Sequence, residues 1–412
     1  MKFKDYYSLS ATIKENLERT GFIKPTDIQY KAIPSILRGE DVLAVAQTGT
    51  GKTAAYAIPV LQKVSEYNAQ ARSEGIKCLV MVPTRELALQ VTEVFQKIGR
   101  GTRVTTFCVF GGVEQGPQIT KLENGIDILV TTPGRMFDLA SQGHIRLNRV
   151  RILVLDEADR MLAEGFLKDI EDVTKRVPKS RQTLFFSATI DEKIKKLAYS
   201  LVTNPIRIQI SPKDPVSKNV NHSVTFVEMD DKRFFLERII RSNPNDKIMV
   251  FVRTKVRAGR VQKALERMGI RAIAIHGDME QVERFEALDM FKAGEVKILI
   301  STDVSARGID IPDIDIVVNY DLPDVAENYV HRVGRTGRGM RKGQAVSFCS
   351  REEEALLAEI ENYITKPINR VDMSKEAYRE ILESSAEVKP DLNALLREIE
   401  EFENRKKRKK KR

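Results

Sequence analysis

One short stretch of the chain, DVLAVAQTGTGKT at residues 41–53, combines residue types and spacing that point to phosphate chemistry. An apolar run, Val42–Ala46, precedes a glycine-rich turn, and Lys52 and Thr53 open a segment that favours helix. In such a strand–loop–helix unit, the backbone N–H groups of the turn and the positive end of the new helix bind phosphate. We expect Lys52 to reach the outer phosphates and Thr53 to ligate Mg²⁺.

This loop departs from the general phosphate-binding pattern at one position, because Ala46 stands where the pattern has glycine. A glycine-rich turn between a strand and a helix can also exist without a ligand. The Gly-Lys-Thr sequence directly after an apolar run favours the phosphate site, although it does not say what the nucleotide is used for. The residues expected to contact a nucleoside triphosphate are Ala46, Gln47, Thr48, Gly49, Thr50, Gly51, Lys52 and Thr53.

Two adjacent carboxylates, Asp156 and Glu157, follow a second apolar run at Ile152–Leu155. Because burying bare charges is costly, such a pair needs a cation or a water network. With a phosphate loop in the same chain, Asp156 is suited to bind Mg²⁺ and Glu157 to orient or deprotonate an attacking water. An acidic loop without a ligand is the weaker alternative at this position.

Length and composition restrict the class of protein. A chain of 412 residues with 42% apolar and 31% charged residues predicts a soluble globular protein of two or three domains. No apolar run is long enough to span a membrane, and the first ten residues lack the apolar core of a secretory signal. Three scattered cysteines and four dispersed histidines show no metal-binding spacing, which predicts buried, reduced thiols in a cytoplasmic protein.

The elements that must position these residues alternate between short apolar runs and helical segments, which predicts an α/β fold. Most runs lack polar alternation, as in strands covered on both faces of a doubly wound parallel sheet. We expect one such domain over residues 1–209, a polar linker over 210–220 and a second over 221–371. The predicted strands are Val42–Ala46, Cys78–Val82, Thr105–Phe110, Ile126–Val130, Ile152–Leu155, Thr183–Phe186, Lys247–Val252, Ala272–Ile275, Lys297–Ile300, Ile314–Tyr320 and Gln344–Phe348.

The remaining segment, 372–412, is expected to be a helical extension with a basic tail. Pro390–Glu403 has an apolar stripe at helical spacing, which would pack against the second domain or dock a partner. The last eight residues, RKKRKKKR, carry most of the formal charge of +10, so the rest of the chain is nearly neutral. A polycation attracts nucleic acid or acidic membranes without reading sequence, whereas a solvated tail is the simpler alternative.

Further short motifs follow other predicted strands, and each would be an ordinary turn or helix cap on its own. They include Gly21–Gln29 (GFIKPTDIQ), Pro83–Leu87 (PTREL), Gly111-Gly112, Thr132–Arg135 (TPGR) and Ser187–Thr189 (SAT). Four arginines lie between Arg332 and Arg341 in a glycine-rich setting. Their density suits an anion, and an exposed basic loop is the alternative.

Taken in order, these motifs resemble those of the DEAD-box ATP-dependent RNA helicases of superfamily 2, of bacterial type. Residues 156–159 read DEAD in one-letter code, the motif that gives the family its name. The resemblance extends from about Phe3 to Gly339 and leaves only the C-terminal extension unmatched. It implies two tandem RecA-like domains, ATP and Mg²⁺ as cofactors, and a cytoplasmic location. The family's loop also commonly carries alanine at the position of Ala46.

The resemblance implies a role for individual residues. Gln29 would pair with adenine within the Q motif that includes Phe22, and Phe3 or Tyr6 would stack on the base. Asp310 would face the ATP ribose, and Arg335 and Arg338 would be arginine fingers. RNA-backbone contacts are implied for Pro83, Thr84, Arg85, Gly112, Thr132, Arg135, Arg253, Arg284 and Thr302. Coupling of hydrolysis to strand separation is implied for Asp159, Ser187, Thr189 and His331.

Because the acidic pair is in the first half and the arginines are in the second, hydrolysis should require closure of the two domains, assisted by RNA. The implied activity is local unwinding of short RNA duplexes, or remodelling of RNA–protein complexes, by a monomeric core. An ATP-gated RNA clamp or scaffold and a DNA helicase or translocase are the alternatives. Ribosomal and RNA-decay proteins are candidate partners, between which the sequence does not choose.

Overall fold

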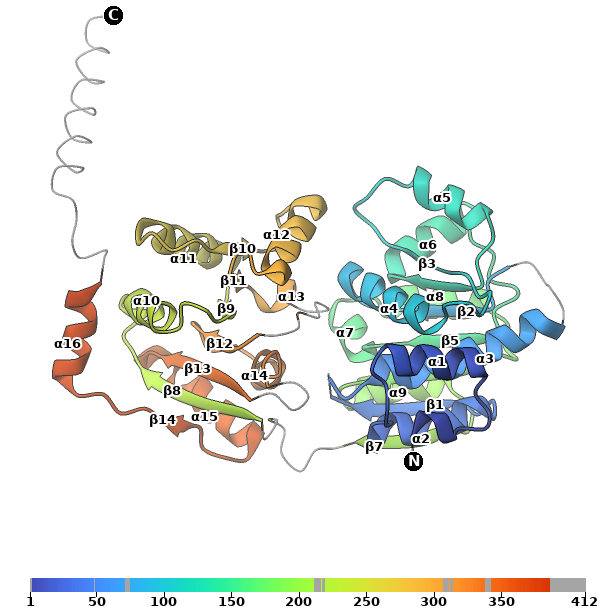
Figure 1. Cartoon of the computed structure of the whole chain (residues 1–412), viewed down its shortest axis with the longest axis horizontal. Helices are drawn as coiled ribbons and strands as arrows, with labels where there is room; N and C mark the ends of the chain where they lie inside the picture. Colours follow the sequence, from blue (N-terminus) through green and yellow to red (C-terminus); the bar gives the residue numbers. More distant parts are fainter. Residues whose placement is uncertain are drawn as a thin grey trace, which may run out of the picture. The chain divides into compact units, whose positions relative to one another are not determined.

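The computed structural model describes residues 2–47, 49–70, 75–210, 216, 219–306, 311, 314–337 and 342–385. The described residues form two compact units, one ending at residue 210 and the other starting at residue 216 (Figure 1). Each unit contains a seven-stranded sheet, and every strand pair in the described residues is parallel. The predicted α/β architecture with two parallel sheets is therefore confirmed.

The sheet of the first unit has the strand order β3-β4-β2-β5-β6-β1-β7. Its strands are β1 (Val42–Ala46), β2 (Cys78–Met81), β3 (Thr106–Val109), β4 (Ile128–Thr131), β5 (Ile152–Leu155), β6 (Gln182–Ser187) and β7 (Ile206–Ile210). The first six overlap the predicted strands. The seventh was not predicted, because it lies at the sheet edge and only its central Ile208 is buried. Its place is set by pairing with β1, where Val42 is opposite Ile206.

Helices of the first unit precede and connect these strands. They are the 3-10 turn η1 (Phe3–Asp5), α1 (Ala11–Arg19), α2 (Asp27–Leu37), α3 (Lys52–Gln70), α4 (Arg85–Ile98), α5 (Gly116–Glu123), α6 (Pro133–Ser141), α7 (Ala158–Ala163), α8 (Leu167–Arg176) and α9 (Glu192–Leu201). Thr84 and Asp191 begin α4 and α9, since each side chain accepts a hydrogen bond from a backbone N–H in the first turn. Leu79, Leu153 and Phe185 lie in the core between sheet and helices.

The sheet of the second unit has the order β10-β11-β9-β12-β13-β8-β14. Its strands are β8 (Val220–Phe226), β9 (Ile248–Phe251), β10 (Ile273–Ile275), β11 (Ile298–Ser301), β12 (Ile316–Asn319), β13 (Gly343–Cys349) and β14 (Asn369–Arg370). The helical elements are α10 (Lys232–Ser242), α11 (Lys255–Arg267), α12 (Gln281–Ala293), α13 (Asp303–Ala306), α14 (Ala326–Val333), η2 (Arg351–Glu353), α15 (Glu354–Ile364) and α16 (Lys375–Ser384). β8 and β14 were not predicted, because both carry exposed residues.

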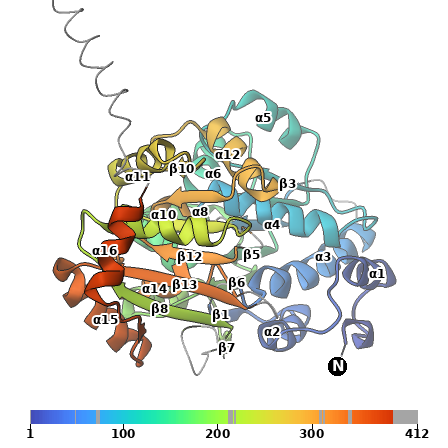
Figure 2. The ribbon, with the colours of Figure 1, turned by 60° about the vertical axis from the view of Figure 1, so that its left-hand side comes forward.

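Helix α16 lies against α10 (Figure 2). The Tyr378 ring packs 4.9 Å from that of Phe235, and its hydroxyl donates to Asp231 Oδ2 over 2.7 Å. Ile381 is buried in the core of the second unit. The first part of the predicted extension 372–412 thus packs on the second unit. The predicted helix 390–403, the basic tail and most of the linker 210–220 lie outside the described residues, so these predictions remain open.

All three cysteines are unpaired and buried, as expected. Burial, together with the nearby Glu353, raises the pKa of the Cys349 thiol to about 12. Within the part of the chain that the structure describes, no helix has the length and apolar character needed to cross a membrane.

Candidate active site

Apart from Phe3, Phe22 and Gln29, which precede β1, the candidate residues of the first unit lie at the carboxyl ends of its strands, which meet at one edge of a parallel sheet. The strand order separates them into two neighbouring groups. Strands β5, β6 and β1 are adjacent and lead to Asp156, Ser187 and the phosphate loop. Strands β3, β4 and β2 are adjacent on the other side and lead to the three predicted RNA-contacting turns. One edge of one sheet therefore carries both groups.

The phosphate loop turns through two glycines in the left-handed region, Gly49 at φ +83° and Gly51 at φ +90°. A Cβ atom at Gly51 would lie 2.5 Å from Gln29 Nε2, so no larger residue fits there without a shift. Lys52 is buried, and its Nζ donates to the Ala46 carbonyl over 2.7 Å. This bond holds the amine close to the start of the loop. The Thr50 hydroxyl donates to the Gln47 carbonyl. Thr48 lies outside the described residues.

The Gln29 amide joins two parts of this site. It lies in the first turn of α2 and is only 2% exposed. Its Oε1 accepts from the Thr26 N–H over 2.9 Å, and its Nε2 donates to the Gly51 carbonyl over 3.2 Å. A primary amide has two donor hydrogens and two acceptor lone pairs, so these bonds use half of its capacity. The other half suits the paired donor and acceptor edge of adenine.

Three aromatic residues at the start of the chain form one cluster. The Phe3 ring is stacked 5.9 Å from Tyr6 and meets Phe22 edge-on at 6.4 Å. Phe3 and Tyr6 are buried, whereas Phe22 is half-buried. A buried ring has no open face for a base. The assignment of Phe3 as the stacking ring therefore stays a prediction, and Phe22 has the most accessible ring of the cluster.

Asp156 and Glu157 are both buried at the end of β5. Asp156 Oδ1 accepts from the Glu157 N–H over 2.9 Å, and Oδ2 accepts from the Tyr56 hydroxyl over 2.9 Å. Burial raises the pKa of Asp156 to about 6, while the nearby Lys52 acts in the opposite direction. A cation beside this carboxyl would favour its ionised form in the same way.

Glu157 has an uncommon backbone conformation for a residue with a side chain, at φ 51° and ψ 47°. Non-glycine residues in this region are strained and gather at functional sites. The Glu157 carboxylate forms an ion pair with Arg160, one turn further along α7. Arg160 was not among the predicted site residues; its spacing of three residues from Glu157 within a helix was the available signal.

The predicted coupling residues of the first unit lie close together. The Thr189 hydroxyl is 3.3 Å from Asp159 Oδ2. Asp159 Oδ1 and Ser187 Oγ are buried, and neither has a hydrogen-bond partner among the described residues. A buried polar group without a partner costs about 1–3 kcal/mol. This cluster therefore retains the capacity for further hydrogen bonds.

The predicted RNA-contacting turns of the first unit support one another. Gly112 has φ +77°, where a residue with a side chain is strained, and a Cβ atom there would have to displace the Arg85 guanidinium. Arg135 Nη2 donates to the Val113 carbonyl over 2.9 Å, and its Nε donates to Phe110. Both arginines thus lie against the segment after β3. The helix-cap and turn positions at this edge are Pro83, Thr84 and Thr132.

The RNA-contacting residues predicted in the second unit also lie on one side of their sheet, near the adjacent strands β10, β11 and β9. Arg253 forms ion pairs with Asp324 at 2.9 Å and Glu353 at 3.1 Å. Arg284 Nη2 donates to the Ser305 carbonyl over 2.8 Å. These contacts hold both arginines at the strand ends. The predicted residues in this group are Arg253, Arg284 and Thr302.

Helix α14 carries the arginine-rich motif. Arg332 is 1% exposed and forms a bidentate ion pair with Asp303 through contacts of 2.6 and 2.8 Å. Arg332 belongs to the arginine-rich motif of the sequence, but no role was predicted for it. His331 lies on the same helix with Nε2 4.0 Å from Glu327, and Arg335 is mostly buried just after it. Arg338 and Asp310 lie outside the described residues.

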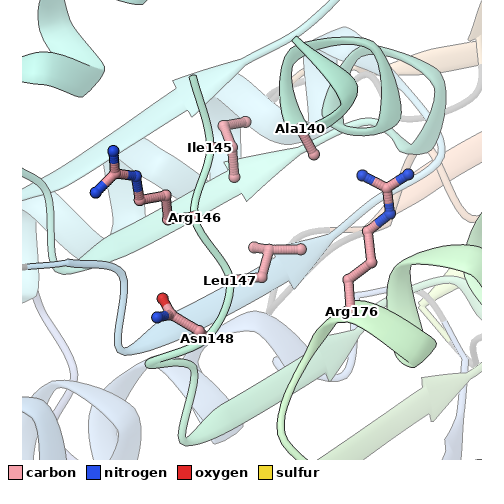
Figure 3. Close-up of a pocket in the computed structure, with 6 residues that line it drawn as sticks. All are labelled: Ala140, Ile145, Arg146, Leu147, Asn148 and Arg176. Atoms are coloured by element: carbon pink, nitrogen blue, oxygen red, sulfur yellow. The ribbon is translucent and has the colours of Figure 1, made fainter. Parts of the chain in front are cut away.

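A hollow of about 260 Å³ in the first unit lies away from these residues. In Figure 3, Ile145 and Leu147 lie between Arg146 and Arg176. The segment 145–148 precedes β5, so the hollow is at the opposite edge of the sheet from the motif-bearing strand ends. None of the candidate residues lines it, and it is therefore not part of the candidate site.

Comparison with known proteins decides the family. The DEAD/DEAH box helicase family matches residues 26–197, and the helicase conserved C-terminal domain matches residues 231–340. The chain is 39% identical to the DEAD-box ATP-dependent RNA helicase CshA of Bacillus subtilis over 94% of its length and 76% of the relative's. It belongs to the DEAD-box ATP-dependent RNA helicases. This DEAD-box chain is also 38% identical to the ATP-dependent RNA helicase DbpA of the same organism, covering 96% of its own length and 80% of DbpA.

Solved structures of DEAD-box helicases share both units with this chain. S. cerevisiae Dbp5 bound to RNA and ADP BeF3 matches with a TM-score of 0.78 and 30% identity, over 91% of this chain and 97% of the other. Mss116p bound to ssRNA and AMP-PNP matches with a TM-score of 0.81 and 29% identity, over 92% and 80% of the two chains. The predicted pair of RecA-like domains is therefore confirmed.

Proposed function

We propose that this DEAD-box helicase hydrolyses ATP in response to RNA and uses the cycle to open short RNA duplexes or remodel RNA–protein complexes. The observation that carries the proposal is the strand order of the first unit. It gathers the phosphate loop and acidic pair on β1, β6 and β5, directly beside the RNA-side turns on β2, β4 and β3. Because β5 and β2 are neighbours, a shift at the nucleotide residues can reach the RNA-side turns within one sheet.

ATP is the nucleotide that suits the site. The turn through Gly49 and Gly51 and the N-terminus of α3 offer backbone N–H groups to the phosphates, and the Lys52 amine lies across the same turn. Gln29 touches that turn, and its hydrogen bonds to described residues use half of its amide capacity, which leaves the other half for the edge of adenine. Base selection and phosphate binding are thus joined through the Gly51 carbonyl.

Mg²⁺ fits the residues at this point. Among the described residues no group of three or more His, Cys, Asp or Glu side chains could hold a metal, which disfavours an all-protein cage. Mg²⁺ usually takes one or two protein oxygens and completes its shell with water and phosphate. Asp156 and Thr53 would hold it, and when bound it would neutralise phosphate charge.

Glu157 is the residue we assign to the attacking water. Its carboxylate is buried and ion-paired with Arg160, which fixes its orientation, and a carboxylate so placed can accept a proton from water. We assign Arg335 and Arg338 to the charge that develops on the transferred phosphoryl group. In related phosphoryl-transfer systems an arginine of this kind accounts for a factor of about 10³–10⁵ in rate.

RNA would be held by its backbone. The turn residues Thr84, Thr132 and Thr302 and the arginines Arg85, Arg253 and Arg284 supply hydroxyl and guanidinium donors, which suit phosphate and sugar oxygens. Such contacts carry no base information, so binding should be largely indifferent to sequence. Arg135 contributes by bracing the segment after β3 through its bonds to two backbone carbonyls.

The basic segment 405–412 would add contacts to structured RNA through charge alone. We expect the core to act as a monomer in the cytoplasm, with ribosomal or RNA-decay proteins as candidate partners.

A duplex-release assay tests the proposal directly. A short RNA duplex and a DNA duplex of the same sequence are each incubated with protein and ATP, and ATP hydrolysis is measured in parallel. Release of the RNA strand together with RNA-stimulated hydrolysis is the expected result. Retention of RNA without release would favour the clamp or scaffold, and equal stimulation by both nucleic acids would favour a DNA helicase or translocase.

A further inference from the structure

Tyr56 is a buried residue of α3 that none of the roles above includes. It follows Thr53 by three residues and Lys52 by four, so the three side chains share one face of the helix. Its side chain is fully buried, with ring centroids 5.2 Å from Phe186 and 6.1 Å from Phe95. These aromatic contacts account for the ring, but they do not account for the hydroxyl group.

The Tyr56 hydroxyl contacts a residue that we assign to the cation site. It donates to Asp156 Oδ2 over 2.9 Å. A tyrosine hydroxyl has an ordinary pKa of about 10, so it is an O–H donor at physiological pH.

Asp156 is held from two directions as a result. Its Oδ1 accepts from the Glu157 N–H, and its Oδ2 accepts from Tyr56. A carboxylate has about four lone-pair positions, so two remain for a cation or its water. A phenylalanine at position 56 would keep the ring packing but would remove the donor that fixes one side of the carboxylate.

We propose that Tyr56 is a positioning residue of the cation site, whose hydroxyl holds Asp156 in the orientation that takes up Mg²⁺. The inference rests on the proposed function, because that function places Mg²⁺ on Asp156. Partners that orient metal ligands without touching the metal change metal affinity by about 10–100-fold when they are removed. The hydroxyl of Tyr56 has that relation to the Asp156 carboxylate.

The test compares Tyr56→Phe with the wild-type protein. Affinity for a fluorescent ADP analogue is measured with excess Mg²⁺ and again with excess chelator. The ratio of the two affinities is the Mg²⁺ gain, the factor by which the metal strengthens nucleotide binding. We expect that gain to fall by about tenfold in Tyr56→Phe, with little change in chelator. The Mg²⁺ concentration for half-maximal ATP hydrolysis should rise by a similar factor, while kcat at saturating Mg²⁺ stays near the wild-type value.

Tyr378→Phe is the matched control. It removes another tyrosine-to-aspartate hydrogen bond, 2.7 Å from Asp231 in the second unit, and should leave the Mg²⁺ gain unchanged. An unchanged gain in Tyr56→Phe, or equal losses with metal and with chelator, would overturn the role. Because Tyr56→Phe keeps the ring contacts with Phe186 and Phe95, it should fold, and its nucleotide affinity in chelator reports whether the phosphate site is intact. A wild-type protein without any Mg²⁺ gain would overturn the cation site and the inference together, whereas the variant result alone overturns only the inference.

Discussion

Arg332 and Asp303 form a bidentate ion pair, with Nε and Nη2 of the arginine 2.6 and 2.8 Å from the two carboxylate oxygens. The pair joins α14, which leads to Arg335, to the residue that directly follows Thr302. Arg332 Nη1 also donates to the Asp321 carbonyl over 2.6 Å. Within the second unit, the segment assigned to ATP and the segment assigned to RNA are therefore held by one side chain.

Removing this pair should affect both segments. In Asp303→Asn the Arg332 guanidinium, 1% exposed, would lose its charged partner. Breaking a buried pair typically costs about 3–5 kcal/mol, and the partial exposure of Asp303 favours the lower value. We expect a lower free energy of unfolding in urea and weaker RNA-stimulated hydrolysis. Asp289→Asn, at an exposed pair with Lys292, is the control, and equal stability of the two variants would contradict the prediction.

Glu157→Gln should separate binding from turnover. The amide keeps the size of the side chain but cannot accept the proton from water, and general-base catalysis is worth about 10²–10⁴ in rate. We expect kcat to fall by at least about 100-fold while ATP and RNA stay bound together. Single-turnover hydrolysis and RNA filter binding measure the two effects. Glu171→Gln on α8 should behave as wild type, and wild-type turnover in Glu157→Gln would show that another group activates the water.

Gly112→Ala should weaken RNA binding without affecting the nucleotide. The new methyl group would meet the Arg85 guanidinium, and a residue with a side chain is strained at φ +77°. We expect RNA affinity to fall by about tenfold, which corresponds to about 1.4 kcal/mol, with unchanged ADP affinity. Gly143→Ala is matched for backbone strain, since Gly143 has φ +85° but open space around its Cβ position. Similar RNA affinities for the two variants would show that Arg85 does not contact RNA.

The buried pair of Lys77 and Asp127 should make the first unit sensitive to acid. Burial alone would raise the pKa of Asp127, but hydrogen bonds from Lys77 at 2.7 Å and from Thr105 outweigh it and hold the pKa below its ordinary value of 3.8. A carboxyl with a lowered pKa in the folded state stabilises the fold above that ordinary value, and this contribution is lost as the pH falls through the folded pKa.

Urea unfolding of the wild type and Asp127→Asn between pH 7 and pH 3 measures this contribution. The variant should be less stable at pH 7, and the difference should shrink as the pH falls below about 4. A constant difference across the range would mean that the charge of Asp127 does not contribute.

Deleting residues 405–412 should change how RNA binding responds to salt. Each phosphate neutralised by a basic residue steepens the dependence of affinity on salt concentration. We expect weaker RNA binding and a shallower slope for the shortened chain, measured by fluorescence anisotropy over a salt series. Identical slopes would indicate that the segment makes no contact with RNA.

The sequence predicted the parts of this molecule whose signal is local. Strands buried on both faces appear as continuous apolar runs, so eleven of them could be located, whereas the exposed strands β7, β8 and β14 could not. The phosphate loop and the Asp156–Glu157 pair were found because neighbouring residues carry their chemistry. Tyr56 and Asp156 are 100 residues apart and meet only because of the order of β1, β6 and β5. Arg332 and Asp303 are likewise 29 residues apart, and only the fold of the second unit brings them together.

Helix α16 determines where the chain can be truncated without exposing the core of the second unit. A chain ended at Val371 would uncover the ring of Phe235 and remove Ile381 from the core, leaving an apolar surface prone to self-association. A chain ended just after Ser385 keeps both, and it also keeps the hydrogen bond between the Ser385 hydroxyl and Glu237. For isolated preparations of this unit, residue 385 rather than residue 371 is the boundary that preserves a closed core.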